Sequence, residues 1–127
     1  MILSAGFACG KGGYSDYRSA LSDLVEAQTK YVSSLQKADK ADDVVNQTKQ
    51  YITSLTAFQV NRSKLFVEHP ELTENVALPS NVATLLEKAA KLDQEIDKAL
   101  IPAITKFQSD ASVMSSWEEL NQKRSKM

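Results

Sequence analysis

Glycine, proline and cysteine are all scarce in this chain of 127 residues, and each scarcity excludes a class of structure. The four glycines lie at or before Gly13 and only three prolines are present, so the chain after Tyr14 largely lacks the residues that interrupt helices. The single cysteine, Cys9, has no partner for an internal disulfide, and the single histidine, His69, cannot provide a histidine-rich metal site. The composition predicts long helices without a metal or other cofactor.

Long apolar runs and an excess of one charge are also missing. No segment approaches the roughly 20 apolar residues that cross a bilayer, so any membrane attachment needs an anchor. The 15 Lys and Arg residues nearly balance the 16 Asp and Glu residues, and the two signs alternate along the chain. Because nucleic-acid-binding proteins present a basic face to phosphates, we expect no nucleic-acid partner.

What the chain does have is a helical apolar pattern after Tyr14, with apolar residues recurring at steps of three and four. Turn and cap residues divide it into helices over 16–38 (N-cap Ser15), from Asp39 or Asp42 to Glu68 or His69, from Ser80 or Asn81 to about Phe107, and after Ser109 or Asp110. Because an apolar helix face is stable only against another, residues 14–127 are predicted to form one domain. The predicted fold is all-α, an antiparallel helical bundle of three long helices plus a shorter C-terminal helix, with a kink near Pro102.

The predicted core consists of the apolar stripes of these helices, with Gln28 filling one step of the first stripe. The stripes are Tyr17, Leu21, Leu24, Gln28, Tyr31 and Leu35; Val44, Val45, Thr48, Tyr51, Ile52, Leu55, Phe58, Leu65 and Phe66; Val82, Leu85, Leu86, Ala89, Leu92, Ile96, Leu100, Ile104 and Phe107; and Val113, Met114, Trp117 and Leu120. Leu72, Val76 and Leu78 are expected to pin the connection 69–80 over the bundle. Aromatic residues left exposed by the packing would be natural anchors for a partner protein.

The first residues favour lipid attachment at Cys9. Residues 1–8 form a short apolar run that includes small residues. Ala8 fits the small residue found before the cysteine in bacterial lipoproteins, where the signal peptide is cut off and the cysteine is acylated. Gly6 does not fit, since an aliphatic residue is usual there, and no basic residue precedes the run. Residues 1–13 are therefore interpreted as a signal remnant or a flexible lipid-anchor tether, with Gly10 to Gly13 as the flexible part. The alternatives are a start further upstream or an inert cysteine in a disordered tail.

Candidate catalytic residues are few, and each has a structural interpretation that we favour. Asp93 and Asp97 share one helix edge and could present two carboxylates to a metal, but no Glu-x-x-His motif accompanies them, so a solvated edge is predicted. Glu118 and Glu119 are adjacent and point in different directions on a helix. His69 lies at a helix end, where it complements the helix dipole. We therefore expect no enzymatic activity.

A set of short motifs resembles a known group of proteins. The motifs are Cys9-Gly-Lys11, Tyr14-Ser-Asp16, the Ala-Asp turn over 37–44, His69-Pro-Glu-Leu72 and Leu78-Pro-Ser80. Together they resemble small helical lipoproteins of Gram-negative bacteria that have no assigned activity. The resemblance covers nearly the whole chain after Cys9. It implies a lipid-anchored, periplasm-facing helical domain and brings no catalytic residues.

Three functions remain open at this point. The favoured hypothesis is a non-enzymatic protein of the cell envelope, tethered through Cys9, that contacts another protein with a helical surface. The second is a soluble helical adaptor or chaperone-like subunit. The third is a carrier of a small apolar ligand, with its cavity around Tyr51, Phe58 and Phe107. Neither the partner nor the oligomeric state follows from the sequence.

Overall fold

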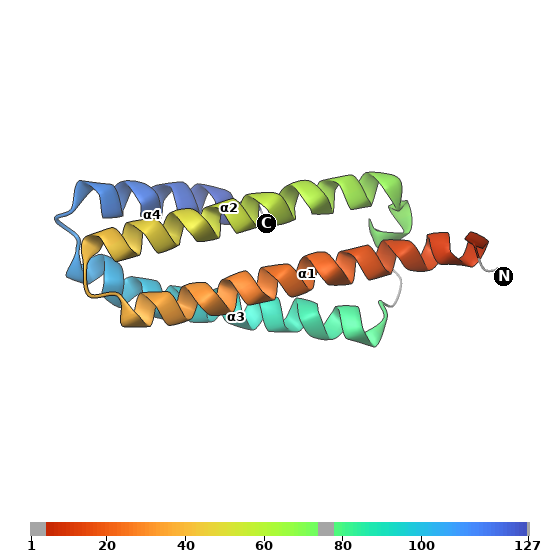
Figure 1. The fold of residues 1–127 in the computed structure, drawn as a ribbon, viewed down its shortest axis with the longest axis horizontal. Helices are drawn as coiled ribbons and strands as arrows, with labels where there is room; N and C mark the ends of the chain where they lie inside the picture. Colours follow the sequence, from red (N-terminus) through yellow and green to blue (C-terminus); the bar gives the residue numbers. More distant parts are fainter. Residues whose placement is uncertain (1–4, 74–77, 127) are drawn as a thin grey trace.

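The computed structural model describes the backbone of residues 5–73 and 78–126, and the side chains from residue 13 onward in these ranges. They form four α-helices, α1 (Ala5–Lys37), α2 (Ala41–Glu68), α3 (Ser80–Lys106) and α4 (Ala111–Arg124), and the short 3-10 helix η1 (Pro70–Thr73). The described residues contain no strand, so the predicted all-α class is confirmed (Figure 1).

The first helix begins earlier than predicted. Ser15 is not its N-cap, because α1 already starts at Ala5 and includes Gly10 to Gly13. Glycine weakens a helix, and this had suggested a flexible tether. At Gly13 the tertiary packing needs a residue without a side chain, because a Cβ atom there would lie only 2.8 Å from Cγ of His69. The absent side chain thus lets α1 approach the end of α2.

The other boundaries follow the predicted signals more closely. The N-cap of α2 is Lys40 rather than Asp39 or Asp42, and Asp43 supports it by accepting a hydrogen bond from the Lys40 backbone N–H (3.3 Å). As predicted, α2 ends at Glu68, and its cap His69 donates its backbone N–H to the carbonyl of Leu65 (2.7 Å). Pro70 then prevents α2 from continuing, as its position predicts, and begins η1.

The last two helices begin where the sequence indicates. The third helix, α3, starts at Ser80 and contains Pro102, whose missing N–H leaves the carbonyl of Lys98 without its usual helical donor. The N-cap of α4 is Asp110, whose carboxylate accepts a hydrogen bond from the backbone N–H of Val113 (3.0 Å). The kink at Pro102 stays a prediction.

The connection from α2 to α3 crosses the end of the bundle. α1 packs against both α2 and α3, and α2 packs against α4, so the two ends of this connection belong to helices on opposite corners. α1 therefore runs parallel to its neighbour α3 and antiparallel to α2 (Figure 1). Leu72 is buried on the way and Leu78 is half-buried, as predicted, while Val76 lies outside the described residues.

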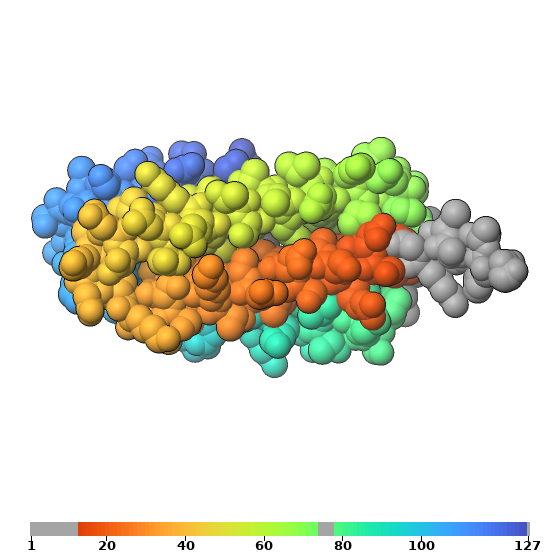
Figure 2. Space-filling model, in the orientation of Figure 1, coloured from red at the N-terminus to blue at the C-terminus, as the bar shows by residue number. Residues whose placement is uncertain are grey.

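The core forms where the four stripes meet. Predicted residues of every helix are buried, including Leu21, Leu55, Ile96 and Leu120 with at most 1% of their surface exposed. Figure 2 shows the side chains of α1 and α2 meeting along most of the face that these helices share. Seven predicted core residues are only half-buried and pack around its edge: Phe66, Leu85, Leu86, Leu92, Phe107, Met114 and Trp117. Within the described residues, no helix combines the length and apolarity that a membrane span requires.

Candidate functional site

The C-terminal end of α4 is bound to α3 by a buried arginine. The Arg124 side chain, 13% exposed, donates from Nε to Asp93 Oδ1 (3.1 Å), from NH1 to Asp97 Oδ1 (2.7 Å) and from NH2 to the Asp93 carbonyl (3.2 Å). Burial lowers the pKa of Arg124, but the hydrogen bonds and charges of Asp97 and Asp93 outweigh it and raise the pKa. This cluster of three residues, the Asp93–Asp97–Arg124 cluster, joins α3 to α4.

The same end of α4 is also bound to α2. Gln59 Nε2 donates to the carbonyl of Lys123 (2.8 Å), and Arg62 donates to the carbonyl of Lys126 (3.3 Å). These carbonyls belong to the last turn and the residues after it, where intrahelical donors run out. Arg62 also lies over the ring of Phe58, 5.4 Å from its centroid, as expected for an arginine stem on apolar surface.

The solvated edge predicted for Asp93 and Asp97 needs a correction. Their side chains are 38% and 57% exposed, but both bind Arg124 of α4. The i, i+4 spacing did place both carboxylates on one side of α3, and only the packing of α4 shows what they face. In the part of the chain that the structure describes, no three His, Cys, Asp or Glu side chains gather as they would around a metal ion.

Beside this cluster lies a groove of about 480 Å³ between α3 and α4, which we call the α3–α4 groove. Its walls are mainly apolar, and its lining residues are Asp97, Leu100, Ile101, Ile104, Thr105, Trp117 and Asn121. Its polar residues lie among the apolar ones: Asp97 and Thr105 four residues on either side of Ile101, and Asn121 on α4. Because α3 and α4 are antiparallel (Figure 1), Asp97 lies toward the end of α4 that carries its partner Arg124, and Thr105 lies toward the part of α4 that carries Trp117.

Apolar surface is exposed in and around this groove. Ile101 is 67% exposed and Trp117 is half-buried, although both belong to helices that bury their other large apolar residues more fully. The sequence predicted Trp117 as core and did not mark Ile101. Among the described residues, the other large exposed apolar side chains are Val60 and Val67, both on α2. The α3–α4 groove therefore combines a hollow with an exposed aliphatic and an aromatic side chain.

A second cluster, of polar side chains, lies inside the bundle between α1 and α2. The rings of Tyr31 and Tyr51 stack with their centroids 4.7 Å apart, and Tyr31 Oη lies 2.7 Å from Thr48 Oγ1. Gln28 is fully buried and donates from Nε2 to the carbonyl of Ala89 in α3 (3.1 Å). Gln28 Oε1 and Tyr51 Oη have no hydrogen-bond partner within ordinary geometry, although they are near enough to interact.

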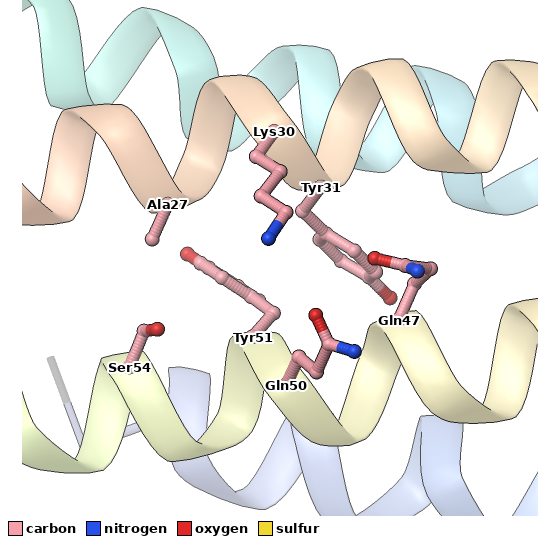
Figure 3. A pocket seen from close by; sticks show the side chains of 7 residues that line it. All are labelled: Ala27, Lys30, Tyr31, Gln47, Gln50, Tyr51 and Ser54. Carbon is pink, nitrogen blue, oxygen red and sulfur yellow. The ribbon is translucent and has the colours of Figure 1, made fainter.

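The chemistry of these tyrosines is that of protonated phenols. Burial raises the pKa of both Tyr31 and Tyr51 to about 12, while the Thr48 and Gln28 side chains act in the opposite direction. Both hydroxyls therefore stay neutral donors near neutral pH and are poor proton acceptors. The hollow beside them, lined also by Lys30, measures about 50 Å³, enough for a water molecule (Figure 3). We interpret this cluster as a device that aligns α1, α2 and α3.

The aromatic residues named for an apolar-ligand cavity lie in different surroundings in the described part of the chain. Tyr51 and Phe58 line two different hollows, of about 50 and 160 Å³, and Phe107 packs against the core near the end of α3. These aromatic residues are used mainly for packing, as their helical spacing suggests. The α3–α4 groove is a larger apolar hollow than either of these, and the aromatic residue in its lining is Trp117.

The remaining candidates are placed as follows. His69 contacts Gly13 and holds Nδ1 3.6 Å from Glu71 Oε2, which gives it a packing role at the helix end. Glu118 and Glu119 are both exposed on α4. Cys9 lies in the first turns of α1, and its side chain is outside the described part of the chain.

Comparisons of the chain with models of protein families, with curated proteins and with solved structures find no match.

Proposed function

We propose that this chain is a non-enzymatic protein of the bacterial cell envelope, anchored through a lipid on Cys9, that works by docking another protein in the α3–α4 groove. The observation that carries the proposal is the groove itself. It presents Ile101 and part of Trp117 to solvent beside a hollow of about 480 Å³, whereas the exposed Val60 and Val67 of α2 do not line this hollow. Exposed apolar anchors beside a hollow are typical of protein interfaces.

The relation between the groove and Cys9 supports this proposal. α1 and α3 run in parallel, and the hydrogen bond from Gln28 to Ala89 fixes which residues are level with each other. With a rise of 1.5 Å per residue, Ile101 lies roughly 45 Å along the bundle axis from Cys9. A lipid on Cys9 would thus hold one end of the bundle at the membrane and present the groove away from it.

The lipid anchor itself is supported by the sequence around Ala8 and Cys9. Metabolic labelling of cells with an alkyne fatty acid tests it, with the full-length chain and its Cys9→Ser variant expressed side by side. We expect label and membrane fractionation for the natural chain and loss of both for Cys9→Ser. A natural chain that carries no label would disprove the anchor and leave the soluble adaptor as the better interpretation.

Docking is tested by placing a photo-crosslinking amino acid at position 101 in intact cells. We expect a discrete adduct with another protein, which disappears when Trp117→Ser is added to empty one wall of the groove. The matched control is the same amino acid at Val67, which is 81% exposed and lies on α2, outside the groove. Adducts of equal yield at both positions, or none at position 101, would contradict docking in the groove.

A further inference from the structure

The α3–α4 groove also restricts what kind of partner segment it accepts, an argument that rests on the proposed docking function. We infer that its occupant is an amphipathic helix of the partner that carries a Lys or Arg one helical turn from an apolar anchor residue. Three features of the groove lead to this description: its shape, the position of its apolar residues and its charge.

The shape of the groove fits a helix. Asp97, Ile101 and Thr105 follow one another at four-residue steps along α3, so they form a strip about 12 Å long on one side of that helix. α4 forms the opposite wall with Trp117 and Asn121. A groove between two antiparallel helices accepts a further helix lying along them, which would bury apolar residues on its contacting face.

The apolar residues define where the anchor binds. Leu100 and Ile104 form buried parts of the wall, whereas Ile101 is largely exposed and Trp117 is half-buried. An aliphatic side chain inserted between Ile101 and Trp117 would cover both of them. This contact is expected to supply most of the binding energy, because interface hot spots are enriched in Trp and cluster in well-packed pockets from which water is excluded.

The charge of the groove selects the basic residue that the partner helix carries one turn from its apolar anchor. The Asp93–Asp97–Arg124 cluster holds two carboxylates and one guanidinium, which leaves one negative charge in excess. Arg124 is 13% exposed, whereas Asp97 is 57% exposed and lines the groove, so the groove presents a carboxylate rather than the guanidinium to a bound segment. Asp97 lies one turn, about 6 Å, from Ile101, and a helix alongside matches this distance with a cation three or four residues from its anchor.

The test uses two helical peptides without tryptophan that share one apolar stripe and differ only in Lys or Glu one turn from the central leucine. Trp117 is the only tryptophan of the chain, so its fluorescence reports occupation of the groove directly. We expect the Lys peptide to bind about 2- to 5-fold more tightly than the Glu peptide, the range of an exposed ion pair. The preference should decrease as salt is raised.

Two variants and a control separate charge recognition from folding. Asp97→Asn should abolish the preference for the Lys peptide while binding of the Glu peptide is retained, because Asp93 still holds Arg124. Ile101→Asp should weaken both peptides. Asp39→Asn removes an exposed carboxylate from the turn between α1 and α2 and should leave the preference unchanged. Circular dichroism melting of each variant checks that the bundle is intact.

The outcomes also separate this inference from the proposed function. Equal binding of both peptides, or a preference that survives Asp97→Asn, would overturn the charged-helix motif even if crosslinking at position 101 still captures a partner. Two peptides that leave Trp117 fluorescence unchanged would also overturn it. A crosslinked adduct between two copies of this chain would make a second copy the occupant and reject the motif, whereas no adduct at all would reject the docking function as well.

Discussion

The edge between α1 and its neighbours differs from the edge between α3 and α4. Along α1 the apolar stripe is almost fully used, with Leu21, Leu24, Tyr31 and Leu35 at most 4% exposed. Between α3 and α4 a groove of about 480 Å³ remains, and Ile101 is 67% exposed beside it. The two edges contain similar residue types, so composition does not distinguish them. The difference indicates that the packing of α1 on its neighbours contributes more to stability than the α3–α4 edge, which is free for an interaction.

The sharpest way to test this comparison is to truncate one apolar side chain on each side of it. Leu55 on α2 is fully buried, so Leu55→Ala should lower the free energy of unfolding by about 2 to 5 kcal/mol. Ile101→Ala removes an exposed side chain and should change it by no more than about 0.5 kcal/mol. Urea unfolding followed by circular dichroism measures both. Equal losses would mean that the two edges contribute alike to stability.

High pH should lower the stability of the edge between α1 and its neighbours, because that edge contains two buried tyrosines. The pKa of Tyr31 and Tyr51 is raised from 10.0 to about 12, so the folded state keeps these protons longer than the unfolded chain does. Their contribution to the free energy of unfolding is complete below pH 10 and is lost as the pH rises from about 10 to 12. At pH 11 the loss should approach about 1.4 kcal/mol per tyrosine.

Unfolding experiments at a series of pH values from 8 to about 11.5 follow this loss, and the double variant Tyr31→Phe, Tyr51→Phe provides the control. Lysines also deprotonate in this range, but they do so in both proteins. The natural chain should therefore lose stability more steeply than the double variant. Parallel curves would show that the buried phenols do not cause the loss of stability at high pH.

The stability of the α3–α4 edge should depend on the Asp93–Asp97–Arg124 cluster. Arg124→Met keeps most of the apolar stem and removes the guanidinium, leaving two carboxylates without their cation. We expect a loss of about 1 to 2 kcal/mol, given the hydrogen bonds to charged groups that disappear. Hydrogen exchange should rise first in α4, while amides of α1 keep their protection. A uniform rise in all helices would contradict an edge-specific role.

The smallest effects concern single hydroxyls in the polar cluster. Tyr31→Phe leaves Thr48 without its 2.7 Å partner and should cost about 1 kcal/mol. Tyr51→Phe removes a hydroxyl that lacks a partner of good geometry, so the change should stay within about 0.5 kcal/mol or stabilise slightly. Thermal melts of the two variants at pH 7 compare them directly. The reverse order would show that Tyr51 and Gln28 form the stronger hydrogen bond.

Several parts of the fold could be predicted because their causes are local. Pro70 ends a helix through the geometry of its own ring, and Asp110 caps α4 with its own carboxylate. The start of α1 could not be predicted in this way. Helix at Gly13 is accompanied by contact with His69, which lies far along the chain. The glycines gave a local signal for a flexible segment, and the structure has helix there.

The candidate site was harder to predict than the fold. The spacing of Asp93 and Asp97 placed two carboxylates on one side of α3, but their partner, Arg124, comes from a helix whose position depends on the whole packing. Ile101 lies outside the predicted stripe, so its spacing gave no sign of the groove that its exposure makes a candidate site. Gln28 was correctly placed in the core, yet its hydrogen bond to Ala89 required knowledge of which helix adjoins α1.

The sequence by itself determined the all-α class, most of the helix boundaries and the residues of the core, because periodicity, caps and proline act within a few residues. Only the tertiary structure decided that α1 lies beside α3, that α2 reaches α3 through a crossing connection, and that the α3–α4 edge stays partly open. Those features depend on how four stripes of unequal length share one core, and no single stripe carries that information.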